Sequence, residues 1–189
     1  ATGTDFSDEG WRDGGGAFEG LTLLEGDLHD LSLTGPYDAI TMWHYLEHDY
    51  APATTLRRLG ELARPGARLF VEVPDHGSWS RRRWGRWWAG YHTPRHTALW
   101  DADTMRVLLE GAGWEVERVE PRGTLDPYTL EWMSRMERRG IDWSSPMAPR
   151  FPGYVARRAA VWPILAAWKA ATGQGGSGLL TAVARLPGP

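Results

Sequence analysis

The residues most able to do chemistry stand close together in the first third of the chain. His44-Tyr45-Leu46-Glu47-His48 has the spacing H-x-x-E-H, a pattern with which some zinc-dependent hydrolases hold their metal. In that pattern both histidines bind zinc from one face of a helix, and the glutamate acts as the general base. The pattern therefore requires a helix at residues 44–48 and a third ligand elsewhere in the chain.

The segments around this cluster favour a different arrangement. Residues 37–42 form a β-prone run, residues 53–63 carry apolar side chains at helical spacing, and residues 67–74 form a second apolar run. A strand, a helix and a strand with short joints predict two parallel neighbours joined by a right-handed crossover. Ligands bind outside the carboxyl ends of such strands. Residues 44–48 are therefore expected at a binding site rather than on a helix, and the sequence offers no obvious third zinc ligand.

Two earlier strands also end in acidic residues. Residues 2–4 lead into Asp5, and residues 21–24 lead into Glu25-Gly26-Asp27-Leu28. Aspartate after a strand is commonly a turn former or a helix cap. Parallel strands, however, place their carboxyl ends along one edge. We therefore expect Asp5, Asp27 and His44 at one edge of one sheet.

The segment 79–100 interleaves arginine with tryptophan and contains His92 and His96. This composition suits nucleic-acid binding through phosphate contacts and base stacking, or contact with a membrane surface. It also suits a lid over the site, with arginine stems packed on indole rings. The lid is favoured because the run is isolated in a slightly acidic chain. Salt-dependent binding to a polyanion would instead indicate a noncatalytic binding module.

The rest of the chain completes an α/β pattern. Asp101 or Asp103 caps a helix that ends near Gly113, and the alternation over residues 114–120 predicts a strand with one face in water. Two helices are expected at about residues 127–139 and 154–171. Residues 179–185 are expected to form the last strand and to pair with the strand at 114–120.

The composition is that of an ordinary globular chain. It has 189 residues, 42% hydrophobic and 24% charged, and a net charge of -3, so no whole-protein field favours nucleic acid. The absence of cysteine excludes disulfides, thiolate metal ligands and cysteine nucleophiles. The most apolar segment, residues 156–171, is too short and too interrupted to span a bilayer. No signal-peptide pattern opens the sequence, so a cytoplasmic location is expected.

Several segments, in order along the chain, carry a family pattern: Thr4-Asp5-Phe6-Ser7, residues 25–28, 37–48, 62–69 and 109–114. Together they resemble the class I S-adenosylmethionine-dependent methyltransferases, in the small-molecule branch similar to the ubiquinone and menaquinone C-methyltransferases. Residues 88–96 are similar to a recurrent segment of one bacterial subgroup. The resemblance covers about residues 1–120 and the last strand. It implies an α/β fold with a Rossmann-like, doubly wound, mostly parallel sheet and an antiparallel last strand.

The resemblance also implies which residues bind the cofactor, S-adenosylmethionine. Asp5 would accept hydrogen bonds from the ribose hydroxyls, with Phe6 beside it. Asp27 would bind the adenine amino group, Leu28 would pack on the adenine face, and Gly26 is counted among the cofactor-binding residues.

Trp43 and His44 would line the pocket around the methionine part and the sulfonium, since an electron-rich ring suits a cation. Methyl transfer is an in-line displacement that depends mainly on positioning. A general base is needed only if the acceptor must lose a proton, and the candidates are His44, His48, His92 and also His96. No metal ligand is expected among them.

One part of the family pattern is missing. The sequence begins at what should be strand two, so the first strand and its glycine-rich loop are absent. Strands two and four then lose their shared neighbour, and we expect cofactor binding to be weak or absent.

The sequence thus predicts a methyltransferase core over residues 1–123, a helical insertion over 124–175, and the final strand and tail over 176–189. The acceptor is expected to be a small molecule bound by residues 75–100 and 124–175. Its identity does not follow from the fold.

Overall fold

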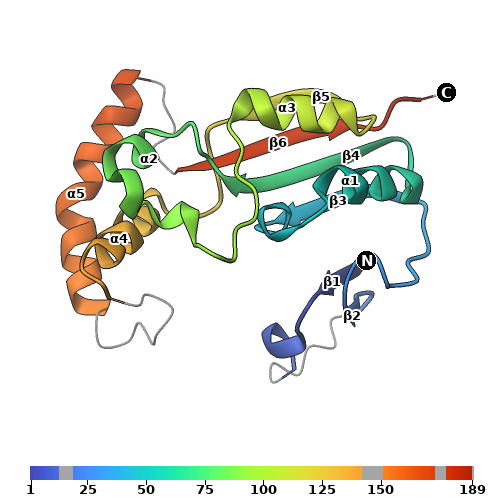
Figure 1. Cartoon of the computed structure of the whole chain (residues 1–189), viewed down its shortest axis with the longest axis horizontal. Helices are drawn as coiled ribbons and strands as arrows, with labels where there is room; N and C mark the ends of the chain where they lie inside the picture. The colour runs from blue at the N-terminus through green and yellow to red at the C-terminus, as the bar shows by residue number, and fades with distance from the viewer. Residues whose placement is uncertain (13–18, 142–150, 173–177, 189) are drawn as a thin grey trace. The chain divides into compact units, whose positions relative to one another are not determined.

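The computed structural model describes residues 1–12, 19–141, 151–172 and 178–188 (Figure 1). Contacts within the chain divide it into two units, residues 1–36 and residues 37–189.

The first unit is built on a pair of parallel strands, β1 (Thr2–Asp5) and β2 (Thr22–Glu25). Their register runs from Thr2 opposite Thr22 to Asp5 opposite Glu25, so both strands end at the same level. The 3-10 helix η1 (Asp8–Gly10) follows β1, and the Oγ of Ser7 accepts a hydrogen bond from the N–H of Glu9. Ser7 therefore caps η1, which forms only one turn.

The second unit is built on a four-stranded sheet with the order β3-β4-β6-β5. Its strands are β3 (Tyr37–Trp43), β4 (Ala63–Pro74), β5 (Glu115–Glu120) and β6 (Leu179–Arg185). β3 and β4 are parallel, and α1 (Pro52–Leu62) connects them. β6 is antiparallel to both β4 and β5. The predicted strand-helix-strand unit and the antiparallel last strand are confirmed.

The described strands form two sheets rather than one. Asp5 and Asp27 follow β1 and β2, whereas His44 follows β3 in the other sheet. The prediction that these three residues share one edge of a single sheet is therefore wrong, because the described strands that precede them belong to two sheets.

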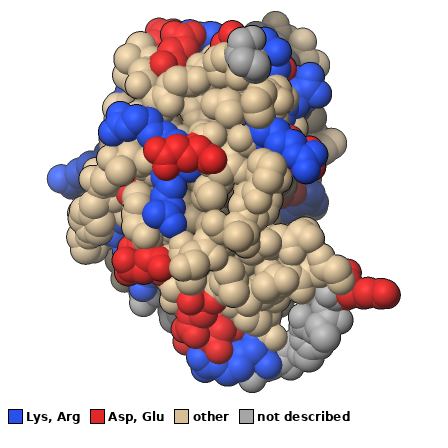
Figure 2. Space-filling view, turned by 90° about the vertical axis from the view of Figure 1, so that its right-hand side faces the viewer, with Lys and Arg blue, Asp and Glu red and all other residues tan. Residues whose placement is uncertain are grey.

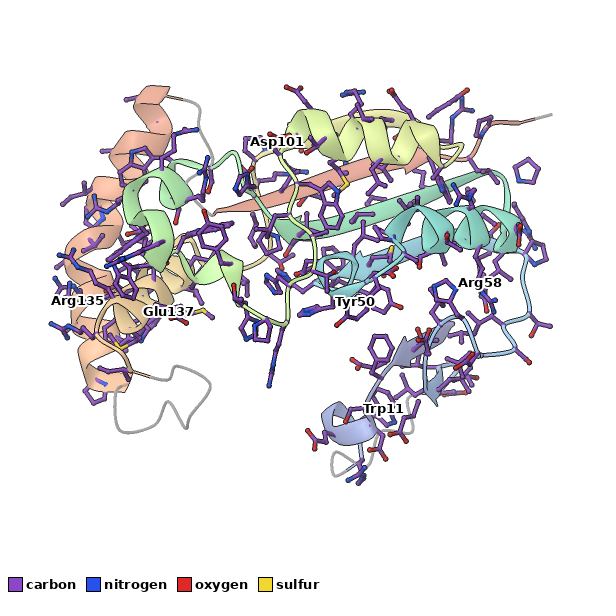
Figure 3. The ribbon with its side chains drawn as sticks, in the orientation of Figure 1. Trp11, Tyr50, Arg58, Asp101, Arg135 and Glu137 are labelled. Atoms are coloured by element: carbon purple, nitrogen blue, oxygen red, sulfur yellow. The ribbon has the colours of Figure 1, made fainter. Side chains whose placement is uncertain are left out.

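Two amphipathic helices cover the larger sheet. α1 packs against β4, α3 (Ala102–Gly111) packs against β5 and β6, and the two helices contact each other. α3 begins with a capping box in which Asp101 and Thr104 satisfy each other's backbone N–H groups (Figure 3). Trp114, 2% exposed, donates its Nε1–H to the carbonyl oxygen of Leu56 at 3.0 Å and joins this layer to β5.

The side chains between the helices and the sheet are apolar, and each contributes about 1.5–3 kcal/mol on burial. The most deeply buried are Leu56, Leu69, Val71, Val73, Met105 and Leu109.

The remaining helices gather beyond the carboxyl ends of β3 and β4 (Figure 1). They are α2 (Trp79–Trp84), η3 (Gly85–Trp87), η4 (Ala89–Tyr91), α4 (Pro127–Arg138) and α5 (Phe151–Thr172). α4 packs against η3, η4, α2 and α5. The two helices expected between the strands at 114–120 and 179–185 are confirmed as α4 and α5.

The surface seen in Figure 2 shows acidic and basic side chains interspersed among uncharged ones, without a field of one sign on that face. None of the helices in the described ranges is long and apolar enough to cross a bilayer.

Candidate functional site

The chain leaves β3 through an unusual backbone conformation at His44. Its φ is 53°, in the left-handed region that few residues other than glycine adopt. The N–H of His44 still donates to the carbonyl oxygen of Glu72 at 3.0 Å, which extends the pairing of β3 with β4 by one residue. This turn directs the imidazole towards two carboxylates.

The imidazole of His44 lies between Glu47 and Glu72. Its Nδ1 is 3.3 Å from Oε1 of Glu47, and its Nε2 is 3.2 Å from Oε1 of Glu72. Both carboxylates are only 1% exposed, whereas the imidazole is 33% exposed. Both contacts are short enough for ion pairs, but their geometry is not that of a hydrogen bond. Within the described ranges, neither Nε2 of His44 nor Oε1 of Glu47 has a hydrogen-bond partner.

These two carboxylates set the charge of His44. Contact with the Glu47 carboxylate raises the pKa of His44 most, and the negative charges of Glu47 and Glu72 raise it further, against the opposing effect of burial. A protonated imidazole has no lone pair to accept another proton. His44 is therefore better suited to hold charge and position groups than to act as a general base.

Glu72 also belongs to this cluster, and the sequence analysis did not single it out. Its carboxylate accepts the N–H of Thr124 at 2.8 Å and the Oγ1–H of Thr124 at 2.7 Å, besides its contact with His44. A glutamate inside the apolar run Leu69-Phe70-Val71-Glu72-Val73 was the available signal, because charged residues are almost never fully buried without a partner.

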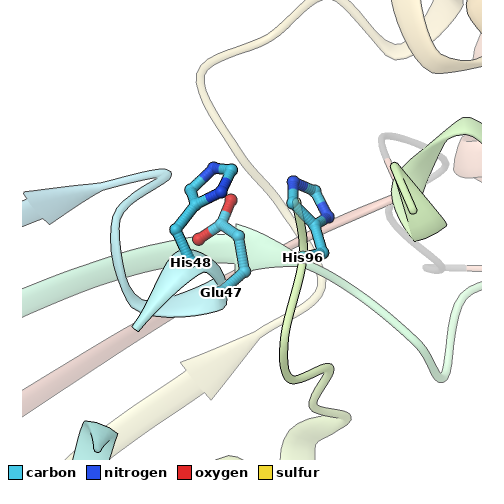
Figure 4. A group of neighbouring side chains, drawn as sticks. All are labelled: Glu47, His48 and His96. Atoms are coloured by element: carbon cyan, nitrogen blue, oxygen red, sulfur yellow. The ribbon is translucent and has the colours of Figure 1, made fainter. Parts of the chain in front are cut away.

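A second cluster lies next to this one and consists of Glu47, His48 and His96. One potential ligand atom from each residue lies within 4.8 Å of the others. In Figure 4 the Glu47 carboxylate lies between the two imidazole rings. Residues 47 and 48 belong to the 3-10 helix η2 (Leu46–His48), and His96 comes from the segment 79–100.

Backbone hydrogen bonds hold this second cluster together. The N–H of Thr97 donates to the carbonyl oxygen of Glu47 at 2.7 Å, and the Oγ1–H of Thr97 donates to that of Asp49 at 2.8 Å. His48 Nδ1 lies 3.2 Å from the carbonyl oxygen of Arg95. The end of the Arg/Trp segment thus packs directly on η2, where the lid interpretation expected contact.

The environment of two neighbouring histidines, His92 and His96, shifts the pKa in the direction opposite to that of His44. Burial lowers the pKa of His92 and of His96, which keeps their imidazoles neutral near pH 7. The rings of His92 and His96 meet edge to face with centroids 5.0 Å apart, and those of His48 and His96 with centroids 4.7 Å apart. His48, His92 and His96 are therefore together, although His92 lies outside the three-residue cluster.

The zinc-hydrolase pattern does not form as that interpretation requires. Helical structure begins at Leu46, and His44 precedes it in the left-handed conformation, so His44 and His48 do not share one helical face. The expectation that no third ligand is at hand was also incomplete, because His96 lies beside Glu47 and His48. A contact across almost fifty residues leaves no trace in local spacing.

The Arg/Trp segment shows the side-chain packing expected of a lid. The guanidinium of Arg83 lies 5.0 Å from the ring centroid of Trp79, and that of Arg86 lies 4.6 Å from the ring centroid of Trp87. Trp88 is 1% exposed, so the segment is anchored in the core.

The first unit brings together the residues assigned to the nucleoside. The N–H of Gly26 donates to the carbonyl oxygen of Asp5 at 2.9 Å, which places both acidic strand ends side by side. Oδ1 of Asp5 accepts the N–H of Ser7 at 3.3 Å, and Oδ1 of Asp27 accepts the N–H of His29 at 2.8 Å. No described residue engages the second oxygen, Oδ2, of either carboxylate.

The neighbouring positions fit a close approach by a ligand. Gly26 has φ 144°, and a Cβ there would meet Leu31 at 3.2 Å. Leu28 is 6% exposed, whereas Phe6 is 54% exposed. In the second unit, Trp43 at the end of β3 is 50% exposed.

A basic pocket lies elsewhere in the second unit. It is lined by Trp84 of α2 and by Arg135, Arg138 and Arg139 at the end of α4; Arg135 is labelled in Figure 3. None of the residues assigned from the sequence to catalysis or cofactor binding lines it.

Comparison with solved structures places the chain in one fold. It is similar to a chain of the complex between the Haloferax volcanii Trm112 methyltransferase activator and a methyltransferase, with 19% identity, a TM-score of 0.60, and coverage of 98% of this chain and 71% of that one. It is similar to a candidate methyltransferase from Bacillus halodurans, with 14% identity, a TM-score of 0.57, and coverage of 98% and 82%. It is also similar to an S-adenosylmethionine-dependent methyltransferase from Mesorhizobium loti, with 14% identity, a TM-score of 0.55, and coverage of 97% and 79%.

These identities establish the fold alone. No curated protein matches the sequence significantly. A family model described as a methyltransferase domain matches residues 2–119, which is more than half of the 189 residues. The chain therefore belongs to the methyltransferase domain family.

Proposed function

We propose that this methyltransferase transfers the methyl group of S-adenosylmethionine to a small molecule. Family membership supplies the reaction and the cofactor. The acceptor class and the residue roles are the proposal. The observation that carries it is the pair Asp5 and Asp27, two acidic side chains at the ends of adjacent parallel strands, each with one oxygen open to a ligand.

These residues fit an adenine nucleoside. Oδ2 of Asp5 would accept the ribose hydroxyls, which is the usual task of an acidic residue at this place in a nucleotide-binding sheet. Asp27 would accept the adenine amino group, and the buried Leu28 would pack on the ring. Gly26, the residue between the acidic end of β2 and Asp27, would let the backbone approach the ligand. Phe6 offers an exposed ring beside Asp5.

In the second unit, Trp43 and His44 would line the methionine part of the cofactor. S-adenosylmethionine, when bound, supplies an electrophilic methyl group. His44 would not take a proton in the reaction, because Glu47 and Glu72 favour its charged form. We assign it a positioning role, in which its ring keeps the turn after β3 in place.

Any proton lost by the acceptor would go to a neutral imidazole. His92 and His96 suit this role because burial lowers their pKa values. His48 is the third candidate, and its ring contacts that of His96.

The acceptor side would be formed by residues 75–100 and by the helical insertion 124–175. Thr97 closes the first of these segments on η2, which favours a small enclosed acceptor over a polymer. We further propose a cytoplasmic location and no nucleic-acid partner, in keeping with the net charge of -3.

Ligand-observed NMR tests this function, because saturation-transfer signals report even weak binding. Saturating the protein in the presence of S-adenosylhomocysteine should transfer signal to the adenine and ribose protons. The variants Asp5→Ala and Asp27→Ala should lose most of that signal, while Asp30→Ala, a control in the same turn, should keep it. Equal signals in all three variants would refute the assignment.

A further inference from the structure

The cluster of Glu47, His48 and His96 has the composition of a metal site. We propose that these three side chains bind one divalent transition-metal ion of the zinc type. Their ligand atoms lie within 4.8 Å of one another, so an ion placed among them reaches all three after small side-chain adjustments. The inference concerns metal binding and goes beyond methyl transfer. With the ion bound, His48 and His96 would hold it, and His92 would remain as the candidate proton acceptor.

Both histidines make the backbone contact that is typical of metal-binding histidines. A carbonyl oxygen can only accept a hydrogen bond, so Nδ1–H of His48 donates to Arg95 at 3.2 Å and Nδ1–H of His96 donates to Gly90 at 2.8 Å. In the neutral imidazole this assigns the lone pair to Nε2 of each ring. A backbone carbonyl on the second ring nitrogen is the arrangement that fixes the tautomer of metal-ligating histidines.

Glu47 supplies the second, independent observation. It is 1% exposed, and neither carboxylate oxygen has a hydrogen-bond partner within the described ranges. Oε1 faces the imidazole of His44 at 3.3 Å, which leaves Oε2 for another cation. A buried carboxylate oxygen without a partner is costly, and a metal ion in the cluster would remove that cost.

The donor set selects the class of ion. Two imidazole nitrogens and one carboxylate oxygen suit zinc and its neighbours Fe²⁺, Co²⁺ and Ni²⁺ better than the oxygen-preferring Mg²⁺ and Ca²⁺. Three protein ligands also leave an open coordination position. This ligand set differs from the H-x-x-E-H pattern, since His96 takes the place that His44 would hold there.

Cobalt titration tests the site through visible absorption, since Co²⁺ replaces zinc and absorbs strongly in four-coordinate sites. One equivalent of Co²⁺ should produce d–d bands, and Zn²⁺ should displace them. His48→Gln, His96→Gln and Glu47→Gln should each weaken Co²⁺ binding more than about tenfold. His92→Asn is the matched control: it removes the neighbouring imidazole, keeps a residue that tolerates positive φ, and should bind Co²⁺ like the unaltered protein.

A second readout separates lost binding from lost folding. Zinc should raise the midpoint of thermal unfolding of the unaltered protein and of His92→Asn, because an ion that binds only the folded state stabilises it. It should not raise that of His96→Gln, whose partly exposed position makes a folded variant obtainable. The proposal is overturned if the unaltered protein gives no d–d bands at millimolar Co²⁺. It is also overturned if His48→Gln and His96→Gln bind Co²⁺ with the affinity of the unaltered protein. The titration uses no methyl donor, so its failure is distinct from failure of the proposed function.

Discussion

Nε2 of His44 lies 3.2 Å from Oε1 of Glu72, and the backbone N–H of His44 donates to the carbonyl oxygen of the same glutamate at 3.0 Å. The end of β3 is thus attached to β4 through both backbone and side chain. Thr124 completes the arrangement by donating two hydrogen bonds to the Glu72 carboxylate. A buried charge in the middle of the sheet connects the turn after β3 with the start of the helical region.

Removal of Glu72 should therefore destabilise the protein. Glu72→Ala leaves Thr124 without its acceptor and takes one of two counter-charges from His44, and breaking such a buried network costs about 3 kcal/mol. Glu117→Ala is the matched control, because Glu117 pairs with Arg68 at the surface at 3.2 Å, where a salt bridge contributes at most about 1 kcal/mol. Urea unfolding measures both changes in the free energy of unfolding. Equal decreases in the two variants would show that the buried network stabilises the protein no more than a surface ion pair does.

Asp75 predicts a pH dependence of stability. It is 5% exposed, and burial raises its pKa from 3.8 to about 6, with a further rise from Asp101 and opposing effects from the Gly77 N–H, Arg82 and Arg81. The folded protein therefore holds this proton more tightly than the unfolded chain does. Its contribution is fully present below pH 3.8 and is lost as the pH rises to about 6.

Asp75→Asn measures this effect, because asparagine keeps an oxygen for the Gly77 N–H and carries no charge. The variant should gain stability relative to the unaltered protein by about 2 kcal/mol between pH 4 and pH 7, from the shift in pKa at about 1.4 kcal/mol per unit. Urea unfolding of both proteins across this range gives the difference. A difference that stays constant with pH would contradict the raised pKa.

Two glycine substitutions test the packing of the Arg/Trp segment. A Cβ at Gly90 would lie 2.3 Å from the ring of the buried Trp88, so Gly90→Ala should destabilise the protein by about 2 kcal/mol. A Cβ at Gly111, near the end of α3, meets nothing within 4 Å, so Gly111→Ala should be neutral or stabilise by up to about 1 kcal/mol. Thermal unfolding distinguishes them, and a harmless Gly90→Ala would mean that Trp88 is not held in this position.

Local sequence patterns predicted the elements of the fold well. The helical spacing at residues 53–63 and the apolar run that begins at residue 67 became α1 and the inner part of β4, and the alternation at 114–120 became β5. Asp101, one of the two expected cap residues, is the cap of α3. Each of these features depends on neighbours within one or two turns, which a single sequence displays directly.

The site was predicted only in part, because its contacts are distant in sequence. His44 at the end of β3 was expected, but its left-handed backbone and its position between Glu47 and Glu72 were not. The approach of His96 to His48 depends on how the segment 79–100 folds back over η2, and no periodicity reports that. The expectation of a single sheet failed for a similar reason, since strand order is a long-range property.

Residue-resolved NMR titration with S-adenosylhomocysteine tests the central claim most directly. In ¹H–¹⁵N spectra, we predict shifts confined to the amides of residues 5–6, 26–28 and 43–44, growing with ligand concentration, and absent at β5 on the opposite edge of the larger sheet. Asp27→Ala should abolish them. The account is contradicted if Asp27→Ala leaves these shifts unchanged, or if the shifts centre instead on the basic pocket of Trp84, Arg135 and Arg138.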